Sequence, residues 1–529
     1  MTKSNWSRRE FLSFMGRTAG ATAAALPVIS CSGPGRTSGI AGIAPATEDE
    51  VVLADGLEYE LLVSWGDPIN GRGDRFGFNN DYTAFFPIDG NPHDGLLWVN
   101  HEEVLSGYFS SPRDPADKSR QDIDREITEV GGSIIRIRMS DGHWRLVPDD
   151  RYNRRIDATT PIPISSAEPV AGTREAIGTL GNCAGGVTPW RTVLTCEENF
   201  HFFYGDVRFE DGRRVHDKDT LIGWDRYLDY PPEHYGWVVE IDPFTGAANK
   251  LTTLGRFAHE GATVTLAHDG RPVVYMGDDK TDEHIYKFVA DEPGSLEQGT
   301  LYAADTDRGR WLPLSLDRDK RLKDAFRTQT ELLIRTREAA KLAGATPQDR
   351  PEDIEIDPQT GAVLIALTKH PLRPYGSLLK LVEKNNDPSA EEFTASTFLA
   401  GGTENGFACP DNLVFDPRGN LWLCTDIASH DLYGLVYAPF KNNGLFHIPM
   451  SGAHAGIPVQ VASAPPGAEL TGPTFSPDGR TLFLSVQHPG EGSDATGALS
   501  SHWPGGGDTL PRPGVICISG PLLDELTAA

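Results

Sequence analysis

The side chains in this sequence that could do chemistry are carboxylates that recur at the ends of short apolar segments. The candidate metal ligands are Asp81, Glu197, Glu198, Glu260, Asp278, Asp279, Glu352, Asp411 and Asp426, with Glu102 and Asp353 at equivalent ends. So many negative charges close together would raise one another's pKa values unless cations neutralised them. Oxygen ligands in such number are typical of calcium or another hard cation. A single such carboxylate is usually a solvated loop end, so the hypothesis depends on the recurrence.

Cys183 differs in chemistry from the carboxylates around it. A thiolate is a soft ligand and indicates a transition metal such as iron or zinc beside the hard ions. Small residues flank it, Gly181-Asn182 before and Ala184-Gly185-Gly186 after, and would allow a metal or substrate to approach closely. We therefore interpret Cys183 as a metal ligand and Asn182 as a substrate contact. The alternative is a disulfide between Cys183 and Cys196.

Arg350 is the one arginine at any of these segment ends. A guanidinium beside carboxylates and metals can donate two parallel hydrogen bonds to the oxygens of a phosphate. Arg350 is therefore the candidate catalytic and substrate-binding residue. The alternative is a structural ion pair with Glu352 or Asp353.

The elements that must position these residues are repeated hairpins. Turn sequences rich in Asp, Pro and Gly separate pairs of apolar strands, as in Asp242-Pro243-Phe244-Thr245-Gly246 and Asp416-Pro417-Arg418-Gly419. Six such hairpins cover residues 79–102, 182–199, 259–279, 350–370, 411–426 and 471–488. The two open ends of an antiparallel hairpin lie together, so each unit brings its polar ends to one face.

Six hairpins with this polarity predict an all-β, six-bladed β-propeller with long inter-blade insertions. A β-sandwich or two all-β domains would be the alternative. One insertion, residues 317–345, has helical spacing, with Leu322 and Phe326 at i and i+4 and a stop at Gly344. It forms either a wall of the site or a surface elaboration.

The N-terminus predicts export. Ser7-Arg8-Arg9-Glu10-Phe11-Leu12 is a twin-arginine pattern, and Val28-Ile29-Ser30-Cys31 is a lipobox in which Cys31 would be acylated. Cleavage near residues 23–25, without a lipid, is the alternative. We assign residues 1–31 to the signal, 32–50 to a flexible tether and 51–529 to one catalytic propeller domain. The expected location is the periplasm or the cell surface, with Cys31 as the lipid anchor in the lipidated case.

The net charge limits the classes of binding partner, and the cysteine count limits how the cysteines can pair. The formal net charge of −27 argues against nucleic acid or an anionic membrane as the main partner and suits cation binding. Five cysteines follow Cys31, an odd number, so in an oxidising compartment at least one would be free, metal-bound or paired between chains. We expect a monomer whose partners are small molecules.

Several stretches resemble the PhoX family of alkaline phosphatases. They are residues 79–82, 100–102, 182–190, 194–199, 256–261, 275–279, 350–352, 410–412 and 487–491. The resemblance implies a six-bladed propeller that hydrolyses phosphate esters and holds a pair of ferric ions and several calcium ions joined by an oxo group. It further implies that Cys183 is an iron ligand, that Glu260 and Glu352 lie in the cluster, and that Arg350 holds the substrate phosphate.

Two positions depart from the family pattern. This chain has Asn412 after Asp411 and Asp353 after Glu352, where the family often has glycine and tryptophan. Two other functions are therefore considered: a calcium-dependent lactonase-like propeller, which would use Asp411 and Asp426, and a non-catalytic ligand-binding propeller. A lactonase of this kind would give Cys183 and Arg350 no role.

Overall fold

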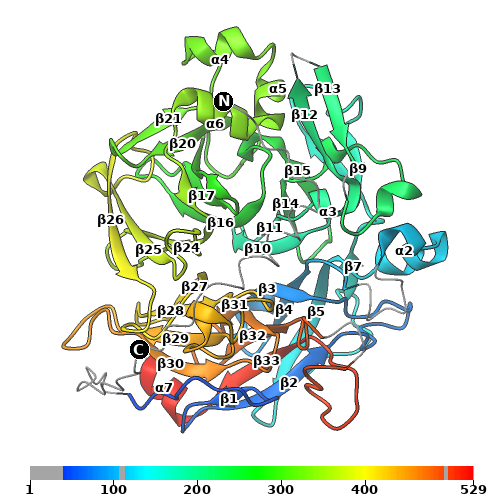
Figure 1. Ribbon diagram of the computed structural model, residues 1–529, viewed down its shortest axis with the longest axis vertical. Helices are drawn as coiled ribbons and strands as arrows, with labels where there is room; N and C mark the ends of the chain where they lie inside the picture. Colours follow the sequence, from blue (N-terminus) through cyan, green and yellow to red (C-terminus); the bar gives the residue numbers. More distant parts are fainter. Residues whose placement is uncertain (1–39, 106–113, 211–212, 219, 494–497, 528–529) are drawn as a thin grey trace, which may run out of the picture. The chain divides into compact units, whose positions relative to one another are not determined.

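Six sheets arranged around a centre form the fold of this computed structural model, which describes residues 40–105, 114–210, 213–218, 220–493 and 498–527 (Figure 1). The predicted signal at residues 1–31 and Cys31 lie outside the described residues. The innermost strands contact one another in the order β3, β10, β16, β23, β27, β31 and back to β3, so the ring is closed. The six-bladed β-propeller predicted from the sequence is confirmed.

Each blade begins with one of the predicted hairpins. Blade 1 contains β3 (Asn80–Pro87), β4 (Asp94–His101), β5 (Gly131–Ser140), β6 (His143–Leu146) and β7 (Arg154–Ile156). Blade 2 contains β10 (Asn182–Val187), β11 (Val193–Glu197), β14 (Val238–Ile241), β15 (Ala248–Leu251), β8 (Pro161–Ser165) and β9 (Glu175–Ile177). Blade 3 contains β16 (His259–Leu266), β17 (Pro272–Asp278), β19 (Ile285–Ala290), β20 (Gly299–Asp305) and β21 (Arg310–Pro313).

Blades 4 to 6 follow along the chain, and blades 5 and 6 each include one strand from its N-terminal part. Blade 4 contains β23 (Pro351–Ile356), β24 (Val363–Leu367), β25 (Ser377–Glu383) and β26 (Phe393–Ala400). Blade 5 contains β27 (Pro410–Phe415), β28 (Leu421–Thr425), β29 (Gly444–Ile448), β30 (Val459–Ser463) and β1 (Val52–Leu53). Blade 6 contains β31 (Glu469–Phe475), β32 (Leu482–Gln487), β33 (Gly514–Ser519) and β2 (Glu58–Ser64).

The turns form for the reasons that the sequence suggests. Asp242 and Asp416 accept hydrogen bonds from the backbone N–H groups two residues ahead, at 2.8 and 2.9 Å. These Asx turns leave the flanking apolar strands free to pair and to bury their side chains between blades. Between blades 5 and 6, for example, Trp422, Leu470 and Ile516 are all fully buried in one cluster.

The chain ends close the ring. β2, near the N-terminus, pairs antiparallel with β33, near the C-terminus, and completes blade 6. The predicted tether differs from the structure at residues 40–50: Ile43 N–H donates to the Gln460 carbonyl at 2.9 Å, and Asp49 accepts from Ser501 at 2.5 Å. The apolar Ile40 and Ile43 pack on blade 5 and 6 residues, so residues in the range predicted to be a tether contact the propeller.

Helices and small ribbons interrupt the blades or connect them, and α4 to α6 lie between blades 3 and 4 in the sequence. The helices are α2 (Arg120–Glu126), α3 (His201–Tyr204), α4 (Lys320–Ala325), α5 (Gln329–Ile334), α6 (Thr336–Ala343) and α7 (Pro521–Thr527), and the ribbons pair β12 (Asp206–Glu210) with β13 (Arg213–Asp217) and β18 (Thr281–Glu283) with β22 (Gln348–Asp349). Short 3-10 turns span Ile88–Gly90, Pro115–Asp117, Trp224–Arg226, Pro232–His234, Thr252–Leu254, Lys384–Asn386 and Leu435–Tyr437. The predicted helical insertion is thus three short helices, α4 to α6, and Gly344 ends α6 in the left-handed conformation as expected.

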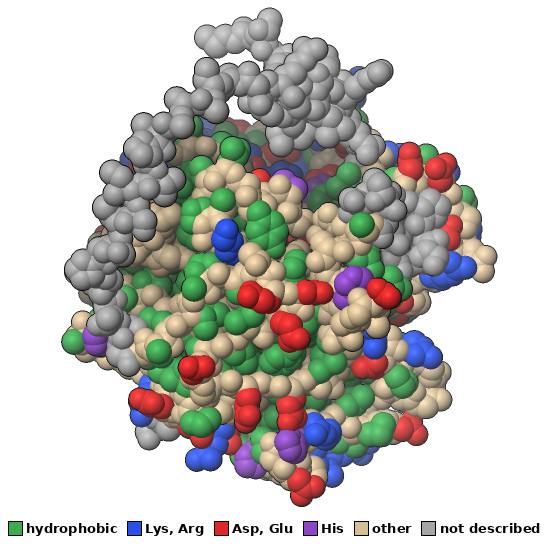
Figure 2. Space-filling view, turned by 60° about the horizontal axis from the view of Figure 1, so that its bottom comes forward, with side chains coloured by type: hydrophobic (Ala, Val, Ile, Leu, Met, Phe, Trp, Pro, Cys, Tyr) green, Lys and Arg blue, Asp and Glu red, His purple; other side chains and the backbone are tan. Residues whose placement is uncertain are grey.

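The surface agrees with the acidic composition. Figure 2 shows acidic side chains spread over one face, with basic ones among them and no continuous basic area. In the part of the chain that the structure describes, no helix is long and apolar enough to cross a membrane.

Candidate metal centre and active site

A β-bulge recurs near one end of all six innermost strands. The register shifts lie between Asn80 and Thr83, Asn182 and Gly185, Glu260 and Thr263, Pro351 and Ile354, Pro410 and Leu413, and Thr471 and Thr474. A bulge bends the strand and re-aims side chains, and bulges are common beside active sites. In four blades the first bulged residue is a candidate ligand, namely Asp81, Cys183, Glu352 or Asp411; in blade 3, Glu260 immediately precedes the bulge.

In blades 1, 2, 3 and 5 the second strand of the hairpin brings a further carboxylate to the same end. The backbone N–H of Glu102 donates to the Asn79 carbonyl at 3.0 Å, and that of Glu198 donates to the Gly181 carbonyl at 2.7 Å. In blade 5 the backbone N–H of Asp426 donates to the Cys409 carbonyl at 2.9 Å. The two open ends of these three hairpins are therefore joined, as the sequence predicts.

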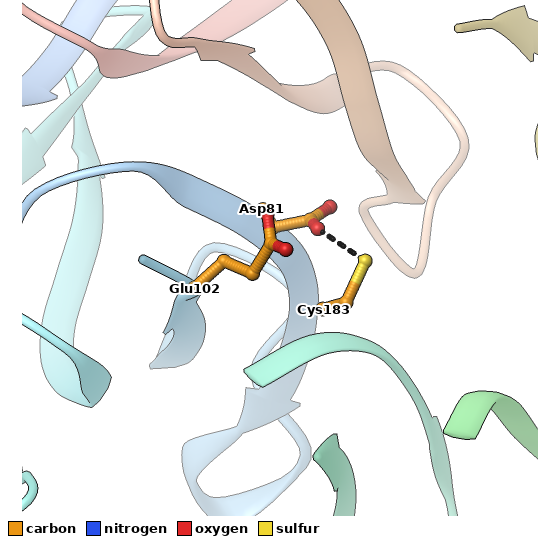
Figure 3. A group of neighbouring side chains, drawn as sticks. All are labelled: Asp81, Glu102 and Cys183. Carbon is orange, nitrogen blue, oxygen red and sulfur yellow. Dashed lines mark hydrogen bonds between the residues drawn. The ribbon is translucent and has the colours of Figure 1, made fainter. Parts of the chain in front are cut away.

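These residues line a cavity of about 250 Å³. Its carboxylates are Asp81, Glu102, Glu103, Glu198, Glu260, Asp279, Glu352, Asp411, Asp426, Glu469 and Glu491. Figure 3 shows Asp81 and Cys183 pointing toward each other with Glu102 alongside; the Cys183 thiol lies 2.9 Å from Asp81 Oδ2 and 3.2 Å from Glu260 Oε1. The predicted cluster around Cys183 is thus present in the structure.

Three overlapping groups within the cavity have metal-ligand geometry. They are Asp81–Glu102–Cys183, Cys183–Glu198–Glu260 and Glu260–Glu352–Asp411, and within each group the ligand atoms lie within 4.8 Å of one another. Cys183 and Glu260 are each shared by two groups. The geometry therefore favours a chain of adjacent cations rather than one isolated ion.

Electrostatics show why this site needs cations. Burial and the charge of Glu102 raise the pKa of Asp81 to about 7. Burial and the charge of Glu352 raise the pKa of Glu260 well above its ordinary value. Burial also raises the pKa of the Cys183 thiol, and the Asp81 and Glu260 carboxylates raise it further. Without positive charge nearby, these groups would hold protons instead of carrying negative charge.

The donor set fits metal ions. Asp426 Oδ1 is buried and has no hydrogen-bond partner among the described residues, which is costly unless something else binds it. Among the described residues, eleven carboxylates line the cavity and Arg350 is the one arginine there. Hard oxygens suit calcium, and the single thiolate suits a transition metal.

Arg350 lies at the wall of the cavity. Its Nε and Nη2 donate to the two carboxylate oxygens of Asp279, both at 2.6 Å, and Nη2 also lies 3.1 Å from Glu352 Oε1. The residue has a φ of 55°, a left-handed conformation that it shares with Asn79 and Cys409 at equivalent strand entries. This conformation costs energy for a residue with a Cβ, and the repeated hairpin closure imposes it.

Two predicted ligands lie outside the cavity, and the structure corrects their assignment. Glu197 is fully buried; its Oε1 accepts from Lys250 Nζ at 2.6 Å, and its Oε2 accepts from the Gly236 N–H at 3.0 Å. Asp278 is also fully buried and forms a two-bond ion pair with Arg337. Because their oxygens are already satisfied by protein groups, both residues are structural rather than metal ligands.

The predicted substrate contact at Asn182 also differs from the structure. Its amide donates to the hydroxyls of Thr179 at 2.8 Å and Thr195 at 2.9 Å, and the side chain is fully buried. It supports the strand entry beside Cys183 and does not line the cavity. The alternative disulfide is absent too, since all five cysteines among the described residues are free.

The cavity contains residues that the sequence analysis did not assign as ligands. Glu102 stands at a predicted hairpin end and Glu103 follows it, so both had a signal in the sequence. Glu469 falls outside the predicted sixth hairpin because β31 begins two residues earlier than residue 471. Burial alone would lower the pKa of His488, but Glu491 and Glu469 raise it well above its ordinary value.

Asp353, one of the departures from the family pattern, lies elsewhere. It lines a second cavity of about 260 Å³ with Tyr82 and Glu355, and its Oδ2 accepts from the Leu413 N–H at 2.9 Å. The extra carboxylate therefore caps a neighbouring strand instead of adding a ligand to the metal centre.

Comparison with known proteins decides the family. Residues 38–490 match the family model described as alkaline phosphatase PhoX. The chain belongs to the PhoX alkaline phosphatase family. A PhoX structure from Pseudomonas fluorescens, in complex with vanadate as a transition state analogue, is 30% identical and has a TM-score of 0.82, covering 92% of this chain and 98% of its own. This PhoX-family chain is accordingly a metal-dependent hydrolase of phosphate monoesters.

More distant structures add nothing to this assignment. A protein of unknown function from Dyadobacter fermentans is 10% identical, with a TM-score of 0.39 over 88% of this chain and 100% of its own. A gluconolactonase from Xanthomonas campestris is 9% identical, with a TM-score of 0.31 over 84% of this chain and 97% of its own. Scores this low carry no argument for the lactonase alternative. No curated protein sequence matches the chain significantly.

Proposed function

We propose that the cavity holds ferric and calcium ions and that the protein hydrolyses phosphate esters there. The observation that carries the proposal is the place of Cys183, which belongs to two of the three overlapping ligand groups. A thiolate there favours iron over calcium, while the group Glu260–Glu352–Asp411 offers only oxygen and favours calcium. When bound, such ions would supply Lewis-acid stabilisation of the charge on the phosphoryl group.

In this proposal the protein binds the phosphate with Arg350. Asp279 occupies Nε and Nη2 of the guanidinium, which fixes its plane. Nη1 makes no hydrogen bond to any described residue, so it is available to donate to a phosphate oxygen. A donor that is already oriented before substrate binds costs little reorganisation as charge develops in the transition state.

Three further properties remain proposals. The twin-arginine pattern supports export to the periplasm or cell surface, and the lipobox supports a lipid anchor at Cys31. Residues from all six blades of one chain line the cavity, so the site needs no second chain, which supports a monomer. Cell fractionation, the mass of the N-terminal peptide and the molar mass in solution would test these proposals.

Removal of metal tests the proposed chemistry. After chelation the rate of p-nitrophenyl phosphate hydrolysis should fall at least about 100-fold, because metals supply several kcal/mol of transition-state stabilisation. Iron with calcium should restore it, and calcium alone should not. The diester bis-p-nitrophenyl phosphate, assayed beside it, defines the range of esters. Full activity of metal-free protein, or full recovery with calcium alone, would contradict the iron–calcium assignment.

A further inference from the structure

Asp279 and Arg350 are attached to the two strands of one small ribbon. β18 begins two residues after Asp279, and β22 ends one residue before Arg350. The strands pair antiparallel, with Thr281 opposite Asp349. The ribbon connects a loop of blade 3 to the entry of blade 4, so its position sets where the Arg350 guanidinium lies relative to the cavity.

Helix α6 contacts both ends of the segment from Asp278, the last residue of β17, to Glu283, the last residue of β18. Arg337 Nε and Nη2 donate to the two carboxylate oxygens of Asp278 at 2.8 and 2.5 Å. One turn later, Lys341 Nζ donates to Glu283 Oε1 at 2.5 Å. Residues at i and i+4 share one face of a helix, so this face of α6 holds the segment from Asp278 to Glu283 at two points.

The pair nearer the cavity has the geometry of an orienting contact. Asp278 is fully buried, and 26% of the Arg337 side chain is exposed. A guanidinium that forms two bonds to one carboxylate fixes orientation as well as distance. The next residue, Asp279, forms the same kind of fork with Arg350. Two adjacent carboxylates thus connect α6 to Arg350.

We infer that Arg337 is a positioning residue, which orients Arg350 toward the substrate phosphate through Asp278 and Asp279. The inference depends on the proposed phosphate-binding role of Arg350. It gives the helical insertion between blades 3 and 4 a function in substrate affinity, although none of its three helices supplies a metal ligand.

The test measures binding of inorganic phosphate to the metal-loaded enzyme by titration calorimetry. Arg337→Gln should weaken binding about tenfold, as expected when a residue that orients a ligand-binding group is lost, and should raise KM more than it lowers kcat. Arg337→Lys keeps the charge but cannot form both hydrogen bonds to Asp278, so its phosphate affinity should lie between those of the wild type and Arg337→Gln. The control is Arg335→Gln, whose ion pairs with Glu331 and Glu338 lie within the insertion; it should bind phosphate as the wild type does.

A double-mutant cycle separates this inference from the proposed function. If Arg350→Gln alone binds phosphate like the wild type, the phosphate role of Arg350 is wrong. If it binds more weakly, adding Arg337→Gln should cause no further loss, because both changes act through one group. An additive loss would overturn the inference, as would an equal loss in Arg335→Gln. If Arg337→Gln does not fold, Arg337→Lys replaces it in the double-mutant cycle with Arg350→Gln.

Discussion

Cys183→Ser enzyme is expected to retain calcium, to contain little iron, and to hydrolyse phosphate monoesters at least about 100-fold more slowly than the wild type. A hydroxyl is a poor substitute for a thiolate toward a transition metal, whereas the oxygen ligands of the calcium ions are unchanged. Loss of several kcal/mol of metal stabilisation, at about 1.4 kcal/mol per factor of ten, accounts for the rate. Elemental analysis together with a p-nitrophenyl phosphate assay checks both parts.

Cys517→Ser is the matched control for this result. Cys517 is likewise a free cysteine, but it is buried in β33 and does not line the cavity. Its replacement should leave iron content and rate near those of the wild type. Normal iron content in Cys183→Ser would show instead that Cys183 is only a packing residue.

Arg350→Ala enzyme is expected to keep its metals and to lose about 10³-fold in kcat/KM. Removal of one oriented donor to the developing charge typically costs 10²- to 10³-fold, and arginines that stabilise a transferring phosphoryl group contribute at the upper end or beyond. Metal content should stay normal because Arg350 binds Asp279 and Glu352 but supplies no metal ligand. Steady-state kinetics and elemental analysis of the same preparation give the comparison.

Arg373→Ala provides the control for loss of a nearby positive charge. Arg373 pairs with Asp349, next to Arg350 in sequence, but its side chain is 63% exposed. Exposed ion pairs contribute little, so kcat/KM should change by less than about twofold. Full activity of Arg350→Ala, or equal losses in both variants, would rule out the phosphate-binding role.

The sequence is sufficient to predict the hairpins because their signals are local. Asp, Pro and Gly residues define the turns, and short apolar strands flank them, so blade number and the common polar face follow without knowledge of distant contacts. Asp81, Cys183, Glu260, Glu352 and Asp411 were therefore found where the bulges place them. The same reasoning located Arg350 at the cavity wall.

The local sequence does not show which of two adjacent carboxylates faces the cavity. Glu197-Glu198 and Asp278-Asp279 each end a second strand, and successive side chains in a strand point to opposite faces. In both pairs the second residue lines the cavity and the first turns away. That choice depends on Lys250 and Arg337, which lie 53 and 59 residues along the chain from their partners. Nothing near either pair in the sequence specifies it.

Anomalous X-ray scattering at the iron absorption edge, from crystals of the enzyme as purified, is the most direct test of the metal assignment. We expect an iron peak within bonding distance of Cys183 Sγ, with calcium between Glu260, Glu352 and Asp411. A cavity that contains calcium alone, or an iron peak remote from Cys183, would contradict it.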